Sequence, residues 1–204
     1  QVRFADSTVW NGATLIAKTV IATEAYDYLV GGAGADVIDG LGGGDYIDGG
    51  AGNDTLSGGA DDDVLLGGAG DDVLDGGVGN DTLQGGTGND TYRFGRGSGQ
   101  DALYDYDVTV GNVDTVEFGA DVLPDDVRVT RDANHLYLTI NGTTDKLTLQ
   151  YYFNGDAYKV EQIRFADSTV WNGATLVAKS LIATEGADNL IGTAGADVID
   201  GLGG

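Results

Sequence analysis

The sequence predicts an all-β protein in which a coil of short parallel strands is followed by a smaller, antiparallel β-rich unit. Two observations predict the coil: an aspartate that returns every nine residues, and an apolar residue two positions after each of these aspartates. A third observation predicts the second unit. From residue 94 the nine-residue period ends, and segments of alternating polar and apolar residues follow it.

The nine-residue period runs without a break through the first half of the chain. Its aspartates are Asp27, Asp36, Asp45, Asp54, Asp63, Asp72, Asp81 and Asp90. A Gly-Gly pair precedes most of them, as at Gly49-Gly50, and glycine permits the positive φ angles of a tight reversal. Each unit is therefore predicted to form a six-residue turn and a three-residue strand whose middle, apolar residue faces inward.

Two such units make one coil of 18 residues, with a turn on each side. Turns 18 residues apart then stack at the strand spacing of about 4.8 Å. One edge of the coil carries Asp27, Asp45, Asp63 and Asp81, and the other carries Asp36, Asp54, Asp72 and Asp90. A solvated Gly/Asp linker is disfavoured, because a linker needs no inward Leu or Ile every nine residues.

The stacked aspartates require a counter-charge. Two carboxylates about 5 Å apart repel by about 3 kcal/mol at an effective dielectric constant near 20. Calcium fits such a site because it takes six to eight oxygen ligands from carboxylates and backbone carbonyls. Magnesium demands a tighter octahedral geometry. Zinc prefers His or Cys ligands, and the chain has one His and no Cys.

The repeated units resemble a known family. Residues 49–57, GGAGNDTLS, are similar to the G-G-x-G-x-D-x-U-x nonapeptide of RTX (repeats-in-toxin), haemolysin-type calcium-binding proteins. The resemblance covers about residues 23–93 and restarts near residue 184. It implies a parallel β-roll with calcium in its turns, secretion by a bacterial type I system, and folding in extracellular calcium.

The resemblance also implies a ligand set. The eight aspartates of the period become side-chain ligands, and Asp101 is expected to cap the last site. Turn carbonyls complete the shells, and the expected ones belong to Gly32, Gly34, Gly50, Gly52, Gly59, Gly68, Gly70, Gly77, Gly79, Gly86 and Gly88. Leu41 and Asp61 depart from the pattern because they stand where it has glycine. In the second copy, Asp188 and Asp197 match, without a stacked partner turn.

A second, longer repeat sets the domain organisation. Residues 162–204 match residues 1–43 at 34 of 43 positions, at a constant offset of 161. The chain, which does not begin with Met, is therefore expected to be a fragment or processed piece of a longer tandem array. The expected order is the end of a preceding β-rich unit and a connector over 1–22, a calcium-binding roll over 23–93, a β-rich haemolysin-type-related domain over 94–171, and a connector with the start of the next roll over 172–204.

The β-rich unit is expected to hold strands over 114–118, 127–130, 135–140, 146–153 and 160–165, with a hairpin over 141–145. A short helix or turn is expected over 172–179. The aromatic run at residues 151–153 favours a core, and a sugar-binding platform is the alternative. The unit resembles the β-rich region that follows the nonapeptides in haemolysin-type calcium-binding proteins.

Composition excludes several functions. A net charge of −23 argues against binding nucleic acid or anionic lipid through a basic face. No apolar run is long enough to span a membrane. A catalytic serine triad would need His135, the only histidine, and a G-x-S-x-G motif around the serine. The segment around Ser98 lacks this motif because Arg96 stands where the first Gly is required, so a serine hydrolase is disfavoured.

Three aspartates after the period, Asp101, Asp105 and Asp107, admit two interpretations: turn chemistry with solubility, or further calcium binding. An EF-hand loop beginning at Asp105 is disfavoured because its sixth position, which requires Gly, is Val110.

The sequence thus predicts a calcium-binding, calcium-dependent folding module of a large secreted or cell-surface tandem-repeat protein. Its expected partners are calcium ions and neighbouring repeat units, without nucleic acid and without membrane insertion by this segment. It is not expected to be an enzyme. The alternatives are a structural spacer or adhesin repeat, and a non-catalytic accessory module of an RTX-type enzyme or toxin.

Overall fold

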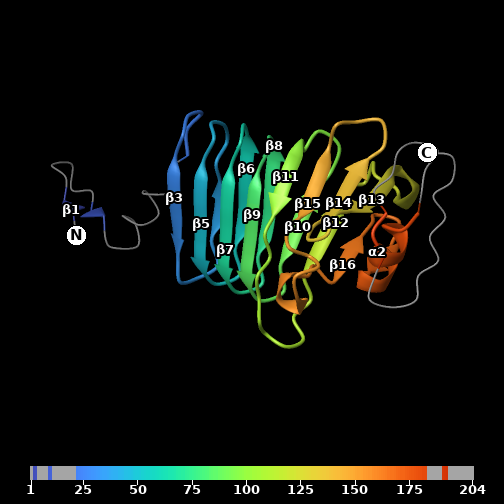
Figure 1. Ribbon diagram of the computed structural model, residues 1–204. Coiled ribbons are helices and arrows are strands. Elements are labelled where there is room, and N and C mark those ends of the chain that lie inside the picture. Colours follow the sequence, from blue (N-terminus) through green and yellow to red (C-terminus); the bar gives the residue numbers. More distant parts are fainter. Residues whose placement is uncertain (1, 4–8, 11–21, 183–189, 193–204) are drawn as a thin grey trace.

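A computed structural model of the 204-residue chain describes residues 2–3, 9–10, 22–182 and 190–192. These residues are nearly all in strands and turns, and two long sheets enclose one apolar core (Figure 1). Apart from the sheets, β1 (Val2–Arg3) and β2 (Val9–Trp10) form a short antiparallel pair. The predicted all-β class is confirmed.

The roll is built from strands that alternate between the two sheets along the chain. One sheet contains β3 (Tyr28–Gly32), β5 (Tyr46–Ala51), β7 (Val64–Ala69), β9 (Thr82–Thr87) and β11 (Gln100–Leu103). The other contains β4 (Val37–Asp39), β6 (Thr55–Ala60), β8 (Val73–Val78), β10 (Thr91–Phe94) and β12 (Thr115–Phe118). Neighbouring strands pair in parallel, and in the repeats the paired residues are 18 apart, as in Leu29↔Ile47. The predicted parallel coil is confirmed.

The inward residues form a continuous column. The apolar residue two positions after each repeat aspartate is buried: Leu29, Ile38, Ile47, Leu56, Leu65, Leu74, Leu83 and Tyr92. Its neighbours in the strand point outward, as the two-residue alternation of strands requires. Burial of each of these side chains contributes about 1.5–3 kcal/mol.

The strands are longer than the three residues expected. From β5 to β9 each has six residues, because the Gly-Gly pair and the next residue continue the ladder, as in Gly50↔Gly68. Only β4 has the predicted length. The second glycine of the pair has a positive φ, +97° at Gly50, so the strand can bend while it stays paired.

The strands after the roll extend both sheets. β15 (Lys146–Leu149) pairs in parallel with β11, and β14 (Leu136–Ile140) and β13 (Val127–Arg131) add antiparallel to it. On the other sheet β16 (Gln162–Arg164) pairs in parallel with β12, and β17 (Val170–Asn172) adds antiparallel. The expected antiparallel β-rich unit is confirmed, and Tyr152 and Phe165 are buried in the same core as the roll.

Three short helical segments complete the described part. They are η1 (Pro124–Asp126), η2 (Asp156–Tyr158) and α2 (Gly173–Lys179). The segment over 172–179, expected to be a short helix or a turn, forms the helix α2, and the Asn172 side chain accepts from the backbone N–H of Thr175 at 3.0 Å. The strand expected over 146–153 ends at Leu149, because Tyr151 turns the chain with a φ of +58°. None of the helices in the described residues has the length and apolarity needed to cross a bilayer.

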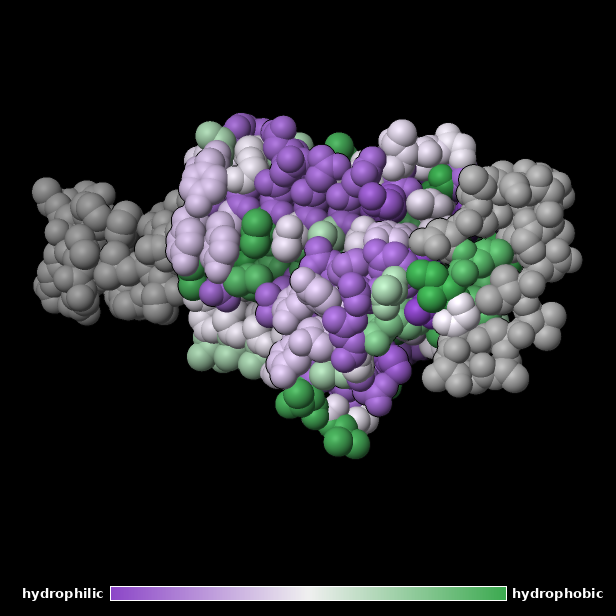
Figure 2. All heavy atoms as spheres, viewed as in Figure 1, coloured by the Kyte–Doolittle hydropathy of each residue, from purple (hydrophilic) through white to green (hydrophobic). Residues whose placement is uncertain are grey.

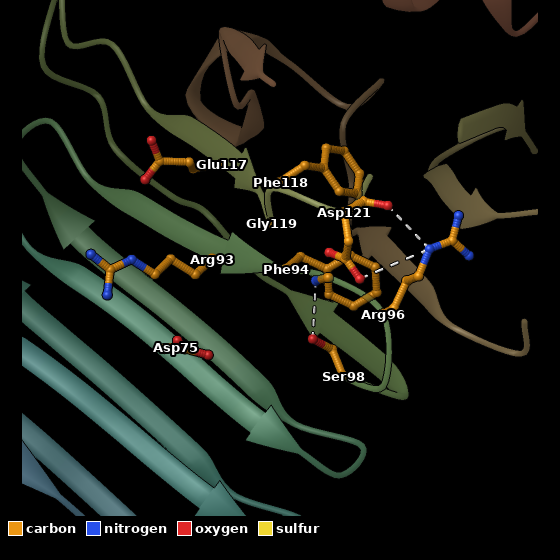
Figure 3. Close-up of a pocket in the computed structure, with 10 residues that line it drawn as sticks. Asp75, Arg93, Phe94, Arg96, Ser98, Glu117, Phe118, Gly119 and Asp121 are labelled. Atoms are coloured by element: carbon orange, nitrogen blue, oxygen red, sulfur yellow. Dashed lines mark hydrogen bonds and ion pairs between the residues drawn. The ribbon is translucent and has the colours of Figure 1, made fainter. Parts of the chain in front are cut away.

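A surface pocket of about 370 Å³ lies over β8, β10 and β12 (Figure 3). Asp75, Arg93 and Glu117 occupy paired positions on these three strands, so opposite charges alternate across the sheet. At the other end of the pocket, Arg96 pairs with Asp121 at 4.0 Å. Such cross-strand pairs of opposite charge stabilise the sheet surface.

Candidate metal centre

Each aspartate of the period stands just before a strand, and from Asp45 onward its side chain reaches the preceding coil. The backbone N–H of Asp45 donates to Asp63 Oδ1 at 2.7 Å, and that of Asp54 donates to Asp72 Oδ1 at 2.7 Å. The same bond recurs along both edges of the roll, so each aspartate ties its own turn to the turn 18 residues before it. The two aspartate columns predicted from the sequence are therefore formed.

The columns continue beyond the nonapeptides by one aspartate each. Asp101 Oδ1 accepts from the N–H of Asp81 at 3.1 Å, and Asp114 Oδ1 accepts from the N–H of Asp90 at 2.8 Å. Asp101 thus stands at the end of its column, and its expected role in capping the last calcium site stays a prediction.

The second carboxylate oxygen identifies the place for an ion. Among the described residues, six buried side-chain oxygens have no hydrogen-bond partner, and all are Oδ2 atoms of the columns: those of Asp45, Asp54, Asp63, Asp72, Asp81 and Asp90. These residues are 1–2% exposed. A buried charged oxygen without a partner is costly, so each of these atoms requires a cation or a proton.

The first glycine of each pair lets two oxygen atoms come close to its backbone. A Cβ at Gly67 would collide with Asp72 Oδ2 and would lie 2.6 Å from the carbonyl oxygen of Gly85 in the stacked turn. A Cβ at Gly49 would likewise collide with Asp54 Oδ2 and lie 2.8 Å from the carbonyl oxygen of Gly67. A carboxylate and a carbonyl from successive coils therefore converge on one space, and calcium takes this combination of ligands.

Burial, with repulsion from neighbouring aspartates, raises the pKa of several column carboxyls. The pKa rises from 3.8 to about 6 at Asp63, Asp72 and Asp81, with burial as the main cause. It rises to about 7 at Asp90 and Asp101, where burial again dominates and other aspartates add to it. Without a cation, these five carboxyls therefore keep their protons up to about pH 6 to 7, whereas an ordinary aspartate loses its proton near pH 3.8.

The first aspartate of each column differs from the rest. Asp27 and Asp36 are half-buried at the open end of the roll. Asp27 Oδ2 accepts from the N–H and the hydroxyl of Thr23 at 2.7 and 2.9 Å, and Asp36 Oδ2 accepts from the N–H of Gly32 at 2.6 Å. In Asp27 and Asp36, protein N–H and hydroxyl groups thus bond the Oδ2 atom. In the six buried aspartates the same atom has no partner.

The expected carbonyl ligands lie in the stacked turns. The carbonyl oxygens of the second and fourth glycines, such as Gly50 and Gly52, point at the glycines of the next coil, Gly68 and Gly70. Their role as ligands stays a prediction. The carbonyls beside free Oδ2 atoms belong to first glycines, which the sequence reasoning left out: Gly58, Gly67, Gly76 and Gly85.

Two further candidate metal ligands lie outside the nine-residue pattern. Asp105 and Asp114 lie with Asp90 in a buried group whose ligand oxygens are all within 4.8 Å of one another. Asp107 serves turn chemistry instead, since it accepts from the N–H groups of Gly88 and Thr109. The second-copy aspartates Asp188 and Asp197 lie outside the described residues.

Sequence comparison decides the family. The RTX calcium-binding nonapeptide repeat matches more than half of the chain, at residues 21–56, 40–74, 48–83, 66–101 and 181–204. The chain belongs to the RTX nonapeptide-repeat family. The haemolysin-type calcium binding protein related domain matches residues 135–175, which lie in the β-rich unit. RTX nonapeptides bind calcium, and the free, buried Oδ2 atoms of this RTX roll fit that ion.

The RTX chain is similar to parts of larger proteins. It is 38% identical over 96 residues to the iron-regulated protein FrpA of Neisseria meningitidis serogroup C, which covers 46% of this chain and 9% of that protein. The chain thus spans less than a tenth of this relative.

Two solved structures are also similar. The first is the AlgE6R3 subunit of the Azotobacter vinelandii mannuronan C5-epimerase, with a TM-score of 0.40, 25% identity, and coverage of 89% of this chain and 95% of that one. The second is the extracellular lipase LipA of Serratia marcescens, with a TM-score of 0.33, 19% identity, and coverage of 70% and 39%.

Proposed function

We propose that this RTX segment is a calcium-dependent folding module of a large secreted or cell-surface protein. The observation that carries the proposal is the set of six buried Oδ2 atoms without a hydrogen-bond partner. The unfolded chain exposes these carboxylates to water, whereas the roll confines them at the spacing of adjacent strands. Calcium binding therefore supplies free energy of folding, as it does in other metal-dependent domains.

This coupling suits export. In a cytosol with scarce calcium the repulsion within the columns opposes folding, so the chain stays extended and able to pass a secretion channel. Outside the cell, sites with dissociation constants of about 10⁻⁴–10⁻³ M, the range of extracellular calcium modules, would fill. The net charge of −23 strengthens the effect, since it adds self-repulsion to the calcium-free compact state.

A second role is compatible with the first. The near-identity of residues 1–43 and 162–204 supports a tandem array in which calcium-filled units act as a spacer or adhesin stalk. An array of two 161-residue units, measured by small-angle scattering in calcium, should be about twice as long as one unit. Two units that scatter as independent bodies on a flexible tether would contradict the stalk.

Catalysis is not part of the proposed role. The Nδ1 atom of His135 accepts the backbone N–H of Tyr151 at 3.0 Å, so this nitrogen is engaged in holding a turn. The segment would then serve as an accessory module if its parent protein is an enzyme or toxin. Ester, peptide and glycoside hydrolysis assays on the chain alone should show no turnover above the buffer, and measurable turnover would overturn this part.

A calcium titration tests the folding module. Circular dichroism should report a gain of β-structure as calcium rises into the millimolar range, and equilibrium dialysis should count about six ions per chain, one for each free Oδ2. Excess chelator should reverse the change. A β-rich spectrum that forms without calcium, or a folded chain that binds no calcium, would contradict the proposal.

A further inference from the structure

We propose that Asp105 and Asp114 complete a calcium site at Asp90 whose ligand set lies outside the nonapeptide pattern, and that this site clamps the end of the roll to the strands that follow it. The inference rests on the proposed function for the identity of the ion. It goes further because it assigns ligand roles to two residues that belong to no nonapeptide.

The three carboxylates come from three separate segments. Asp90 precedes β10 at the end of the roll, Asp114 precedes β12 in the same sheet, and Asp105 follows β11 in the opposite sheet. The three residues are no more than 2% exposed, and their ligand oxygens lie within 4.8 Å of one another. An ion held here would therefore connect both sheets at the point where the repeats end.

The free oxygen of Asp90 points into this group. Asp90 Oδ2 is buried without a hydrogen-bond partner in the described part of the chain. A Cβ at Gly85 would collide with both Asp90 Oδ2 and the hydroxyl of Tyr92, so these two oxygens border the same space. The Tyr92 hydroxyl in turn donates to Asp105 Oδ1 at 3.1 Å.

Tyr92 marks the departure from the repeat. It occupies the inward position that holds Leu or Ile in the earlier units, and its hydroxyl accepts the N–H of Gly85 at 2.9 Å. In the earlier turns, a carbonyl oxygen of the next coil borders the space beside the free Oδ2, as the Gly85 carbonyl does at Gly67. At Gly85 the Tyr92 hydroxyl, in place of a carbonyl, lies beside Asp90 Oδ2, and this hydroxyl is hydrogen-bonded to Asp105.

Asp114 is held in position by its neighbours. Its Oδ1 accepts from the N–H of Asp90 and its Oδ2 accepts from the Asn112 amide, both at 2.8 Å. Its own N–H donates to Glu161 Oε2 at 2.8 Å, next to β16. Each oxygen of Asp114 keeps a lone pair for a metal, so the bonds orient the ligand without consuming it.

Charge decides in favour of a dication. Three carboxylates so close together in a buried space are stable only if protons or a cation reduce their repulsion. One shared proton would remove a single charge and satisfy two oxygens. A calcium ion offsets two charges and accepts oxygen ligands from all three residues, including the unpartnered Asp90 Oδ2.

The test counts calcium in an Asp105→Asn variant of the full chain. The substitution keeps the side-chain shape and removes one ligand charge. Asp125→Asn, on the exposed surface of η1, removes the same charge far from the site and serves as the control. Equilibrium dialysis in millimolar calcium should give one ion fewer per chain for Asp105→Asn than for the wild type, and the wild-type number for Asp125→Asn.

A second variant covers the case in which Asp105→Asn fails to fold in saturating calcium. Tyr92→Phe keeps the buried ring and removes the hydroxyl that borders the site. The dissociation constant of the calcium ion at the Asp90 site should be about tenfold higher in this variant than in the wild type, equivalent to about 1.4 kcal/mol. Circular dichroism in calcium checks that this variant retains the roll.

The outcomes separate this inference from the function on which it rests. A wild-type chain that binds no calcium contradicts the folding module itself. A wild-type chain that binds calcium, together with an Asp105→Asn or Tyr92→Phe variant that matches it in number and affinity, overturns only the clamp. In that result Asp105 and Asp114 share a proton instead of an ion.

Discussion

At the scale of the residue, the two oxygens of each column aspartate have different roles. In the six aspartates from Asp45 to Asp90, Oδ1 accepts a backbone N–H from the preceding coil, and Oδ2 is buried without a hydrogen-bond partner. Asparagine can retain the first bond through its amide oxygen, but it cannot supply the negative charge at the second position. This difference allows structural and ion-binding roles to be separated by one substitution.

The first prediction compares two neighbouring aspartates. Asp63→Asn should shift the midpoint of calcium-dependent folding to higher calcium, because it removes a ligand charge from a buried site. Asp62→Asn should leave the midpoint nearly unchanged, because Asp62 is exposed and its Oδ1 accepts from Asn80, a role that an amide oxygen can keep. Calcium titrations followed by circular dichroism measure both, and equal shifts would contradict the assigned roles.

The second prediction concerns Leu41, which stands where the pattern has a second glycine and adopts a φ of +72°. A left-handed conformation costs a residue with a Cβ about 1–2 kcal/mol. Leu41→Gly should therefore raise the free energy of unfolding in calcium by about 1 kcal/mol. Leu41→Ala keeps the Cβ and should show no such gain, and urea denaturation of both variants provides the measurement.

At the scale of the element, the turn works because its first glycine is empty of side chain. The space that a Cβ would fill at Gly67 lies between a free carboxylate oxygen and a carbonyl oxygen of the next coil. A methyl group there would push both oxygens away, and these are oxygens that the proposed calcium ion needs as ligands.

The third prediction follows from that geometry. Gly67→Ala should abolish one calcium site and lower the unfolding temperature in calcium, because its Cβ would collide with Asp72 Oδ2. Gly34→Ala is the matched control, since no atom outside its chain neighbours lies within 4 Å of the added Cβ. Differential scanning calorimetry in calcium should rank Gly67→Ala well below Gly34→Ala, and equal unfolding temperatures would contradict the model of the turn.

The nine-residue period made most of the roll predictable. Its spacing placed Leu65 inside, paired the coils 18 residues apart, and put Asp63 and Asp81 in one column. It missed the length of the strands, because glycine pairs are typical of turns and here they also form ladder bonds. The role of the first glycine as open space for Oδ2 depends on stacking between coils, which no single unit displays.

The end of the roll was not predictable from the period. Asp105 and Asp114 reach Asp90 through sheet pairings between segments that are 15 to 24 residues apart and follow no repeat. Tyr92 looked like one more inward apolar residue, and only its buried hydroxyl, which donates to Asp105, shows a polar role. A tyrosine in an otherwise Leu/Ile position was the one signal in the sequence.

At the scale of the whole molecule, the same two sheets carry the aspartate columns and enclose the apolar core. Hydrophilic residues gather in a band along one edge of the roll (Figure 2), whereas the column aspartates themselves are buried. Because both sheets continue from the roll into β15 and β16, loss of order in the roll should reach the strands that pair with it. Calcium is thus expected to control the stability of both parts.

The fourth prediction is that the folded state of the calcium-free chain becomes less stable as the pH rises. Five column aspartates, Asp63, Asp72, Asp81, Asp90 and Asp101, have pKa values of about 6 to 7, above the ordinary 3.8, so the folded state holds protons that the unfolded state releases. This contribution to stability is complete below the unfolded pKa and is lost as the pH rises through about 6 to 7. A chain stripped of calcium should therefore show more β-structure at pH 5.5 than at pH 7.5.

Calcium should reverse this order, because its carboxylate ligands must be deprotonated and calcium affinity falls as the pH falls. Circular dichroism at both pH values, with and without calcium, supplies the measurement. A calcium-free chain that loses structure on acidification would contradict the account of the columns.

The most direct test of the central claim is the size of the chain in solution with and without calcium. Small-angle scattering in millimolar calcium should give a radius of gyration near the roughly 17 Å of a compact chain of this length, somewhat increased by the elongated shape of the roll. In EDTA at pH 7.5 the radius should rise toward the roughly 49 Å of an unfolded chain. An equally compact and equally heat-resistant chain in both solutions would contradict the claim that calcium closes the roll.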